Sequence, residues 1–435
     1  MYERIPIINR LEKAYRNAII KQFAINPDRT RKMLVRALGA VRFQTKRLPD
    51  KRFVPAREYL FSAISEGIGL CLKNRIRFAV TNISMPCELL HAMGIYPIVA
   101  ESFAHGFSLA AIERPLIEKA ENCGIPESLC SYHKVFIGAA ESGILPKPEF
   151  VVYTAFPCDA NRLSFKHVAD HYSIPDFCID VPRETNGDTI AYLAHQLRET
   201  VGFIEECTGR KMNHDVLKLT LAKSRDTLRN YKTFLKYRQT RFVPTDMLTE
   251  MLQVTSNHVL LGTDAAKRFS EMLVEDTGRR PESRDIKRLA WIHVMPVWQK
   301  SLNEALLSHR NVELLGCDIA YNALTEPDPE RPFESLAERL LTSSLNGPVA
   351  RRIDAALDFA LKMNADGVIF FNNWGCKATL GAAQLARKKM ESHNLPTLLL
   401  DGDGCDCGNV NEGQMVTRVE AFLEQLETAK SDGQI

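Results

Sequence analysis

The sequence predicts an α/β protein with two Rossmann-like parallel-sheet lobes, a helical N-terminal part and a helical middle segment. Three observations favour this fold. Continuous apolar runs alternate with amphipathic segments, which is typical of parallel strands covered by helices on both faces of the sheet. The stretch 189–310 instead carries charged residues at helical spacing. Finally, 435 residues exceed what one simple core accommodates, so two or three domains are expected.

Two strand–helix–strand units account for the first lobe. In the first unit, Pro86 suits the first turn of the helix, Ser84 is the expected N-cap, and Gly94 ends the helix. The elements of the two units are, in chain order, a strand at 76–81, a helix at about 86–93, strands at 96–100 and 150–156, a helix at about 161–171 and a strand at 176–181.

The second lobe is expected to repeat this plan. Each lobe has a cysteine at an equivalent strand end, so the two lobes could be related units. The expected elements are strands at 289–294, 311–315, 368–371 and 397–401, a loop at 325–332 and a helix at 380–392. The predicted domains are a basic helical N-terminal part at 1–65, a first lobe at 66–188, a mainly helical bridging segment at 189–285 and a second lobe at 286–435.

The composition is that of an ordinary globular protein, with 45% hydrophobic and 25% charged residues. A net charge of +3 argues against a general nucleic-acid-binding surface. Because the sequence has no signal-peptide run and no stretch of about 18 apolar residues, we expect a cytoplasmic protein without a membrane partner. Basic residues crowd 29–57, which we interpret as a solvated face or as a surface for an acidic partner.

Several common functional motifs are absent from the sequence. There is no G-x-x-x-x-G-K-[ST] phosphate loop, so the chain is a poor candidate to hydrolyse ATP itself. No G-x-G-x-x-G follows a strand, and a nicotinamide cofactor therefore has no support. Local zinc-ligand spacings and a G-x-S-x-G nucleophile elbow are also missing.

Cysteines at strand ends are the most informative feature of the chain. Cys158 and Cys376 each follow a predicted strand and precede a predicted helix. Ligands bind beyond the carboxyl ends of parallel strands, and helix N-termini stabilise thiolates there. Together with Cys130, these thiols could hold an iron–sulfur cubane with one iron left open, although dispersed cysteines also have innocent arrangements. The other cysteines are expected to be reduced, as in the cytoplasm, and three are expected to be small buried hydrophobes: Cys71, Cys178 and Cys207.

Three sequence blocks resemble a known family. Residues 81–97 resemble the N-terminal signature of the 2-hydroxyacyl-CoA dehydratase and benzoyl-CoA reductase family. Residues 143–149, leading into 157–159, resemble its second block, and residues 413–422 its C-terminal signature. The resemblance covers about 60–428, apart from the helical middle.

The resemblance implies a fold, a cofactor and partners. Family members have two α/β lobes and pair as two related subunits, each with a [4Fe–4S] cluster on three cysteines, which correspond here to Cys130, Cys158 and Cys376. A separate ATP-hydrolysing iron–sulfur activator supplies one electron. The dehydratases then eliminate water from an (R)-2-hydroxyacyl-CoA through a ketyl radical to give an enoyl-CoA.

Polar residues near the first signature have several interpretations. Glu88 could steer a proton or orient the hydroxyl group, or it could be a first-turn acid stabilised by the helix dipole. Ser84 is a candidate catalytic residue, but we expect it to be an N-cap. Histidines 91 and 105 are expected to be structural. Lys134 and Arg418 could meet CoA phosphates, but an ordinary surface salt bridge is favoured for each.

Further cysteines leave the ligand count open. They could be spectators, or they could extend the ligand set to a larger double-cubane cluster: Cys87, Cys317, Cys405 and Cys407. The leading hypothesis is a dehydratase subunit. The alternatives are a reductase of the same family and a non-catalytic electron-transfer or partner subunit.

Overall fold

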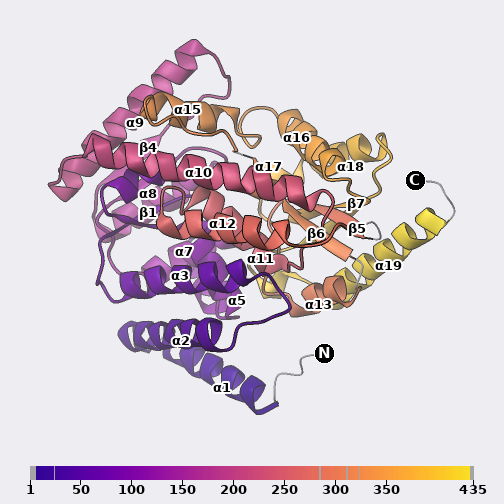
Figure 1. The fold of residues 1–435 in the computed structure, drawn as a ribbon. Helices are drawn as coiled ribbons and strands as arrows, with labels where there is room; N and C mark the ends of the chain where they lie inside the picture. The colour runs from indigo at the N-terminus through magenta and orange to yellow at the C-terminus, as the bar shows by residue number, and fades with distance from the viewer. Residues whose placement is uncertain (1–5, 24, 284–285, 310–311, 323, 432–435) are drawn as a thin grey trace.

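The computed structural model describes all residues except 1–5, 24, 284–285, 310–311, 323 and 432–435. It contains two four-stranded parallel sheets with helices around both, which confirms the predicted fold class (Figure 1). The first sheet has the order β2-β1-β3-β4, and the second has the matching order β6-β5-β7-β8. The equal order supports the interpretation of the lobes as related units.

The strands are short and largely buried. The first sheet contains β1 (Phe78–Thr81), β2 (Tyr96–Val99), β3 (Val151–Thr154) and β4 (Asp176–Ile179). The second contains β5 (Lys287–Ile292), β6 (Val312–Cys317), β7 (Gly367–Asn373) and β8 (Thr397–Gly402). In the first sheet, β2 is added on one side of β1 and β3 on the other; in the second, β6 and β7 lie on opposite sides of β5. Ligands bind at such topological switch points, beyond the carboxyl ends of the strands.

Helices fill the N-terminal part and the predicted middle segment. The N-terminal helices are α1 (Pro6–Phe23), α2 (Pro27–Arg47) and α3 (Pro55–Leu72), and the middle helices are α9 (Gly187–Thr208), α10 (His214–Arg238), α11 (Met247–His258) and α12 (Asp264–Gly278). Helices α10 and α12 lie side by side, and α2 packs between α1 and α3 (Figure 1). None of the helices in the described part of the chain has both the length and the apolar composition needed to cross a bilayer.

The remaining helices belong to the lobes. The first lobe has α4 (Glu88–Ala92), α5 (Ala100–Leu109), α6 (Arg114–Asn122), α7 (Ser131–Glu141) and α8 (Ala160–Tyr172). The second has α13 (Lys300–Ser308), α14 (Asp318–Tyr321), α15 (Pro332–Thr342), α16 (Val349–Lys362), α17 (Lys377–Leu380), α18 (Ala383–Glu391) and α19 (Glu412–Ser431). One hydrophobic core cluster contains residues of both lobes and of the middle helices, so burial of apolar surface holds the lobes together.

Local details differ from the sequence predictions. Helix α4 begins at Glu88, Cys87 occupies its N-cap position, and no side chain caps it, so the N-cap prediction for Ser84 is wrong. Strand β5 ends at Ile292 because His293 adopts a positive φ of 81°. The predicted helix at 380–392 is divided into α17 and α18. The end of α4 at Gly94, with φ of 70°, is confirmed.

The strand predicted at 311–315 is β6, but Asn311 itself lies outside the described residues. The predicted loop at 325–332 is confirmed up to Arg331, since α15 begins at Pro332. The domain boundaries stay predictions.

Candidate functional site

A cavity of about 770 Å³ brings the three predicted cluster cysteines together. Cys130, Cys158 and Cys376 all line it, although they come from three distant parts of the chain. Cys130 directly precedes α7, Cys158 lies between β3 and α8, and Cys376 lies between β7 and α17. The predicted position at a strand end and a helix start is therefore confirmed for Cys158 and Cys376.

A glycine allows the two lobes to meet beside these thiols. Gly375 has a positive φ of 75°, which glycine adopts without strain. A Cβ atom built on Gly375 would lie 2.8 Å from the Cα and 2.9 Å from the backbone nitrogen of Cys130. The loop after β7 thus lies directly on the backbone before α7, and this contact sets Cys376 next to Cys130.

Cys376 lies in an electropositive, hydrogen-bonded environment. Its Sγ atom lies 3.2 Å from the Thr379 hydroxyl. Burial by itself raises the pKa of this thiol, but His293, Thr379 and Arg352 oppose that effect and lower the pKa to about 6. Cys376 is therefore mainly a thiolate at neutral pH, which is the form that binds metals.

Residues that follow three strands of the second lobe build this environment together with Arg352 of α16. Arg352 donates to the carboxylate of Asp318 at 2.5 Å and to the Thr379 hydroxyl at 3.2 Å. The backbone N–H of His293 donates to Asp318 at 2.7 Å, and the His293 ring lies 3.3 Å from the Arg352 guanidinium. No sequence motif marks Arg352, Asp318 or Thr379. The only local signal is the position of His293 at the end of a predicted strand.

For the other two cluster thiols, Cys130 and Cys158, burial dominates and the pKa is raised. Burial, and then the negative charge of Cys376, raise the pKa of Cys130 well above its usual range. Burial likewise raises the pKa of Cys158 to about 11, although the backbone N–H of Ala160 opposes this. A bound metal would reverse both shifts, because a coordinating thiol loses its proton.

The three thiols fit a cluster better than a single ion. Among the described residues, no set of three metal-binding atoms that includes any of these sulfurs lies within 4.8 Å of one another. Ligands of one ion would have to converge more closely, whereas each thiolate of a cubane binds a different iron. The donor chemistry also fits, since thiolates are the usual ligands of iron–sulfur clusters.

Among the carboxyl groups that share the cavity with the thiols, Glu101 has a strongly shifted pKa. Glu101, in the first turn of α5, lines the cavity and accepts a hydrogen bond from the Ile83 backbone N–H at 3.2 Å. Its withdrawal from bulk water raises its pKa to about 7. Such a group can both accept and donate a proton near neutral pH. Nothing in the sequence distinguishes Glu101 from an ordinary acidic residue in the first turn of a helix.

His105 and Tyr132 also line the cavity. The His105 Nε2 atom lies 3.1 Å from the Tyr132 hydroxyl and 3.4 Å from the Met295 carbonyl oxygen. Burial lowers the pKa of His105 to about 4, so its ring is neutral at pH 7. His91, expected to be structural, is bonded to the Val259 carbonyl oxygen at 2.8 Å.

The structure places the predicted catalytic pair away from the cavity wall. Neither Glu88 nor Ser84 is among the residues that line the cavity. The buried Glu88 carboxylate accepts two hydrogen bonds from Arg339, at 2.6 and 2.8 Å, and one from Ser224 at 3.0 Å. Burial opposes ionisation of Glu88, but Arg339 lowers its pKa, so the pair is ionised. A catalytic role for Glu88 or Ser84 stays a prediction.

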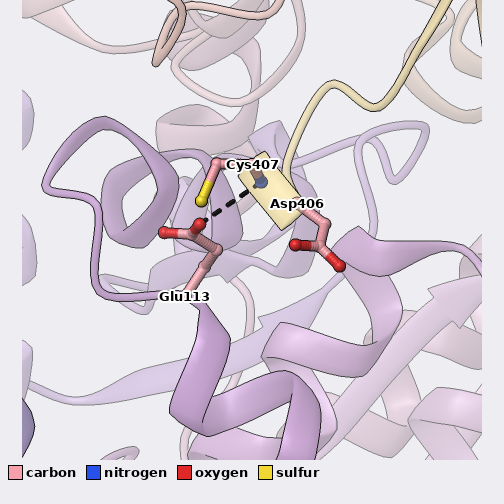
Figure 2. Close-up of side chains that lie close together, drawn as sticks. All are labelled: Glu113, Asp406 and Cys407. Atoms are coloured by element: carbon pink, nitrogen blue, oxygen red, sulfur yellow. Dashed lines mark hydrogen bonds between the residues drawn. The ribbon is translucent and has the colours of Figure 1, made fainter. Parts of the chain in front are cut away.

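The four further cysteines do not line the cavity. Cys87, Cys317 and Cys405 are buried, and burial raises the pKa of each thiol well above its usual range. Cys407 is exposed and lies beside Glu113 and Asp406 (Figure 2). Of the cysteines expected to be buried hydrophobes, Cys71 is buried, whereas Cys178 and Cys207 are half-buried.

The two candidate phosphate-binding residues have protein partners. Lys134 is buried and donates to Glu121 at 2.7 Å and to the Glu127 carbonyl oxygen at 2.9 Å. Arg418 donates to the Leu399 carbonyl oxygen and lies 3.6 Å from Asp401. Both residues therefore form ion pairs within the chain, as expected, but the pair of Lys134 is buried and not at the surface.

Comparison with known proteins gives one family. A family model described as "2-hydroxyglutaryl-CoA dehydratase, D-component" matches residues 82–426. The alpha subunit of (R)-phenyllactyl-CoA dehydratase from Clostridium sporogenes is 23% identical over 386 residues, which cover 84% of this chain and 91% of that protein. The alpha subunit of lactoyl-CoA dehydratase from Anaerotignum propionicum is 23% identical and covers 79% of this chain and 89% of its own length.

A beta subunit is also similar to this chain. The beta subunit of the phenyllactyl-CoA dehydratase from Clostridium sporogenes is 30% identical over 129 residues, which cover 28% of this chain and 33% of that protein. The alpha subunits match far more of the chain than the beta subunit does.

Proposed function

The chain belongs to the 2-hydroxyglutaryl-CoA dehydratase D-component family, and we propose that it is the iron–sulfur subunit of an enzyme that eliminates water from an (R)-2-hydroxyacyl-CoA. The observation that carries this proposal is the meeting of Cys130, Cys158 and Cys376 at one cavity. A [4Fe–4S] cluster on these thiolates would supply one electron and an open iron that acts as a Lewis acid.

The residues around the thiols have defined tasks in this proposal. Arg352 and His293 hold Cys376 in its thiolate form, ready to bind iron. Glu101 is the proton-exchanging group: its carboxylate accepts the proton that leaves the β-carbon and passes it to the hydroxide already expelled, which becomes water. Apolar residues of α2, α3 and α5 line the same cavity and exclude water from the acyl group, including Leu38, Ile64, Ile68 and Phe103.

The electron must come from outside the chain, whose sequence has no phosphate loop. We therefore propose that a separate ATP-hydrolysing activator delivers it. The thioester carbonyl takes up the electron, and the resulting ketyl radical anion expels the neighbouring hydroxyl. Loss of the β-proton and return of the electron then give the enoyl-CoA and water, without net oxidation or reduction.

We further propose that the chain acts with a second, related subunit. The support is the naming of its relatives as alpha subunits, one of which has a beta subunit that also resembles this chain.

Anaerobic iron analysis tests the cluster. We expect about four irons per chain after anaerobic purification, and their loss in Cys158→Ser and Cys376→Ser. Cys123→Ser is the matched control, because Cys123 is another free thiol that does not line the cavity. Full iron in both cluster variants would refute the ligand assignment, and about eight irons would indicate a double-cubane cluster instead.

Activity assays then test the reaction. With the activator, ATP and a candidate (R)-2-hydroxyacyl-CoA, the product should be the enoyl-CoA. Reduction of an aromatic acyl-CoA, without dehydration of any 2-hydroxyacyl-CoA, would replace the dehydratase by a reductase. Electron uptake with no turnover in the presence of the partner subunit would show a non-catalytic role.

A further inference from the structure

A second group of side chains that could hold a metal ion lies where the two lobes meet. Glu113 directly precedes α6 in the first lobe, whereas Asp406 and Cys407 follow β8 in the second. One ligand atom from each of these three residues lies within 4.8 Å of the other two. Figure 2 shows the Glu113 carboxylate turned toward the Cys407 thiol. The proposed dehydration uses none of them.

Polar contacts already join the lobes at this point. The Cys407 backbone N–H donates to Glu113 Oε1 at 3.4 Å, drawn as the dashed line in Figure 2. Arg114 donates to both carboxylate oxygens of Asp406, at 2.9 and 3.1 Å. The Asp406 Oδ1 atom also accepts from the Gly408 backbone N–H at 2.8 Å.

The second oxygen of Glu113 points to a missing ligand. Glu113 is only 1% exposed, and apart from the Cys407 thiol beside the carboxyl group, its Oε2 atom has no hydrogen-bond partner among the described residues. A buried carboxylate oxygen without a partner is costly, and such atoms in native structures are normally satisfied by a group, water or ion. A cation at this point would satisfy Oε2.

The ligand chemistry selects the class of cation. Calcium and magnesium prefer sites made of oxygen atoms alone, whereas one thiolate with two carboxylates suits zinc or ferrous iron. Burial and the Glu113 carboxylate raise the pKa of the Cys407 thiol to about 12, so this thiol would lose its proton only on binding the metal. The exposed Cys407 side chain gives the ion a path from solvent and leaves room for water as a further ligand.

We propose that Glu113, Asp406 and Cys407 form a zinc-type divalent cation site that clips the two lobes together. In the absence of the ion, Arg114 forms an ion pair with the Asp406 carboxylate. The Arg114 side chain is 46% exposed, so it can withdraw into solvent when the ion binds. Because the ligands come from residues almost 300 positions apart, no local spacing motif reveals the site, and the sequence analysis found no zinc signal.

The clip would support the cluster site without taking part in the reaction. In the same loop, Asp403 Oδ1 accepts hydrogen bonds from the Ser131 hydroxyl at 2.5 Å and from the Asp406 backbone N–H at 2.8 Å. Ser131 directly follows Cys130. Fixing the loop through Asp406 and Cys407 therefore also fixes the backbone that carries a proposed cluster ligand.

Zinc binding to the cluster-loaded protein tests the proposal. The protein is incubated anaerobically with Zn²⁺, passed through a desalting column, and analysed for zinc and by X-ray absorption at the zinc edge, where iron does not interfere. We expect bound zinc with a single sulfur neighbour, and a higher Tm than without zinc. Cys407→Ser should lose the zinc, the sulfur signal and the Tm increase, while Cys123→Ser, which removes another exposed thiol, should keep all three.

Two results would overturn the site. One is equal zinc content in Cys407→Ser and Cys123→Ser, which would mean an adventitious ion only. The other is a zinc signal without sulfur ligands in the wild-type protein. Glu113→Gln gives a second check: it should weaken zinc binding while leaving the iron content unchanged, and unaltered zinc binding would contradict the role of the buried carboxylate.

Discussion

At the residue scale, two acidic groups in one cavity are shifted in opposite directions. Withdrawal from water raises the pKa of Glu101 to about 7, because it outweighs the hydrogen bonds from backbone N–H groups, including that of Ile83. Burial acts on Cys376 in the same direction, but His293, Thr379 and Arg352 overcome it and lower the pKa of this thiol to about 6. Opposed shifts of this kind divide the tasks of metal ligand and proton carrier between two groups.

The pH dependence of turnover should report Glu101. Because its carboxylate is the proposed base, the activity should rise with pH through an apparent pKa of about 7. Glu101→Gln should lower the rate by about 10²- to 10⁴-fold and abolish this limb of the pH–rate profile. The iron content serves as the control and should not change. An unchanged profile in Glu101→Gln would assign the proton transfer to another group.

The same group links stability to pH. The pKa of Glu101 is raised from 4.5 in the unfolded chain to about 7 in the folded protein. The stability that it contributes is therefore fully present below pH 4.5 and is lost as the pH rises through 7. In urea-unfolding experiments at several pH values, the free energy of unfolding of Glu101→Gln should lack this part of the decrease with rising pH.

At the element scale, buried ion pairs join helices and strands that are distant in sequence. Glu88 of α4 is bonded to Ser224 of α10 and to Arg339 of α15. Arg238 of α10 is likewise fully buried and pairs with Glu250 of α11 and Glu313 of β6. Removing one partner of such a pair leaves an uncompensated charge, which makes these contacts strict determinants of how the elements dock.

Removal of the Glu88 charge tests its structural role. Glu88→Gln should lower the free energy of unfolding by about 3–5 kcal/mol, because it leaves Arg339 buried and unpaired. Asp358→Asn is the matched control: it removes the charge of the exposed pair with Lys362 and should cost less than ~0.5 kcal/mol. Urea titration measures both. A Glu88→Gln protein that keeps its stability and iron but loses turnover would instead support a catalytic role for Glu88.

At the scale of the whole molecule, the site exists only because the lobes are held in one orientation. Cys376 comes from the second lobe, while Cys130 and Cys158 come from the first. The shared core and the contact of Gly375 with the Cys130 backbone fix their separation. A cluster bound to all three would in turn hold the lobes together.

A single methyl group at this contact should disturb the cluster. In Gly375→Ala, the new Cβ would lie 2.8 Å from the Cα atom of Cys130, at a backbone φ of 75° that alanine rarely adopts. The loops must move apart, so we expect reduced iron content and a matching loss of activity. Gly381→Ala is the control, because a Cβ there meets nothing within 4 Å. Full iron content in Gly375→Ala would show that this contact does not set the spacing of the ligands.

The sequence predicted the parts of this protein that local chemistry decides. The strand preceding Cys158 consists of consecutive apolar residues that pack on both faces of a buried sheet, so its end, and the place of the thiol there, could be predicted. The same holds for the strand preceding Cys376. The helix break at Gly94 likewise depends on one residue's freedom to adopt a positive φ. Ser84 was misjudged as an N-cap because the hydrogen bond it was expected to make depends on the turn geometry before α4.

The sequence by itself thus determined the α/β lobes and the strand-end positions of Cys158 and Cys376, because apolar periodicity and turn chemistry act over a few residues. Only the tertiary structure decided which charges meet: Glu88 with Arg339, Arg352 with Cys376, and Glu113 with Cys407. Electrostatic effects and burial depend on distances in space, and these residues become neighbours only when the two lobes pack against each other.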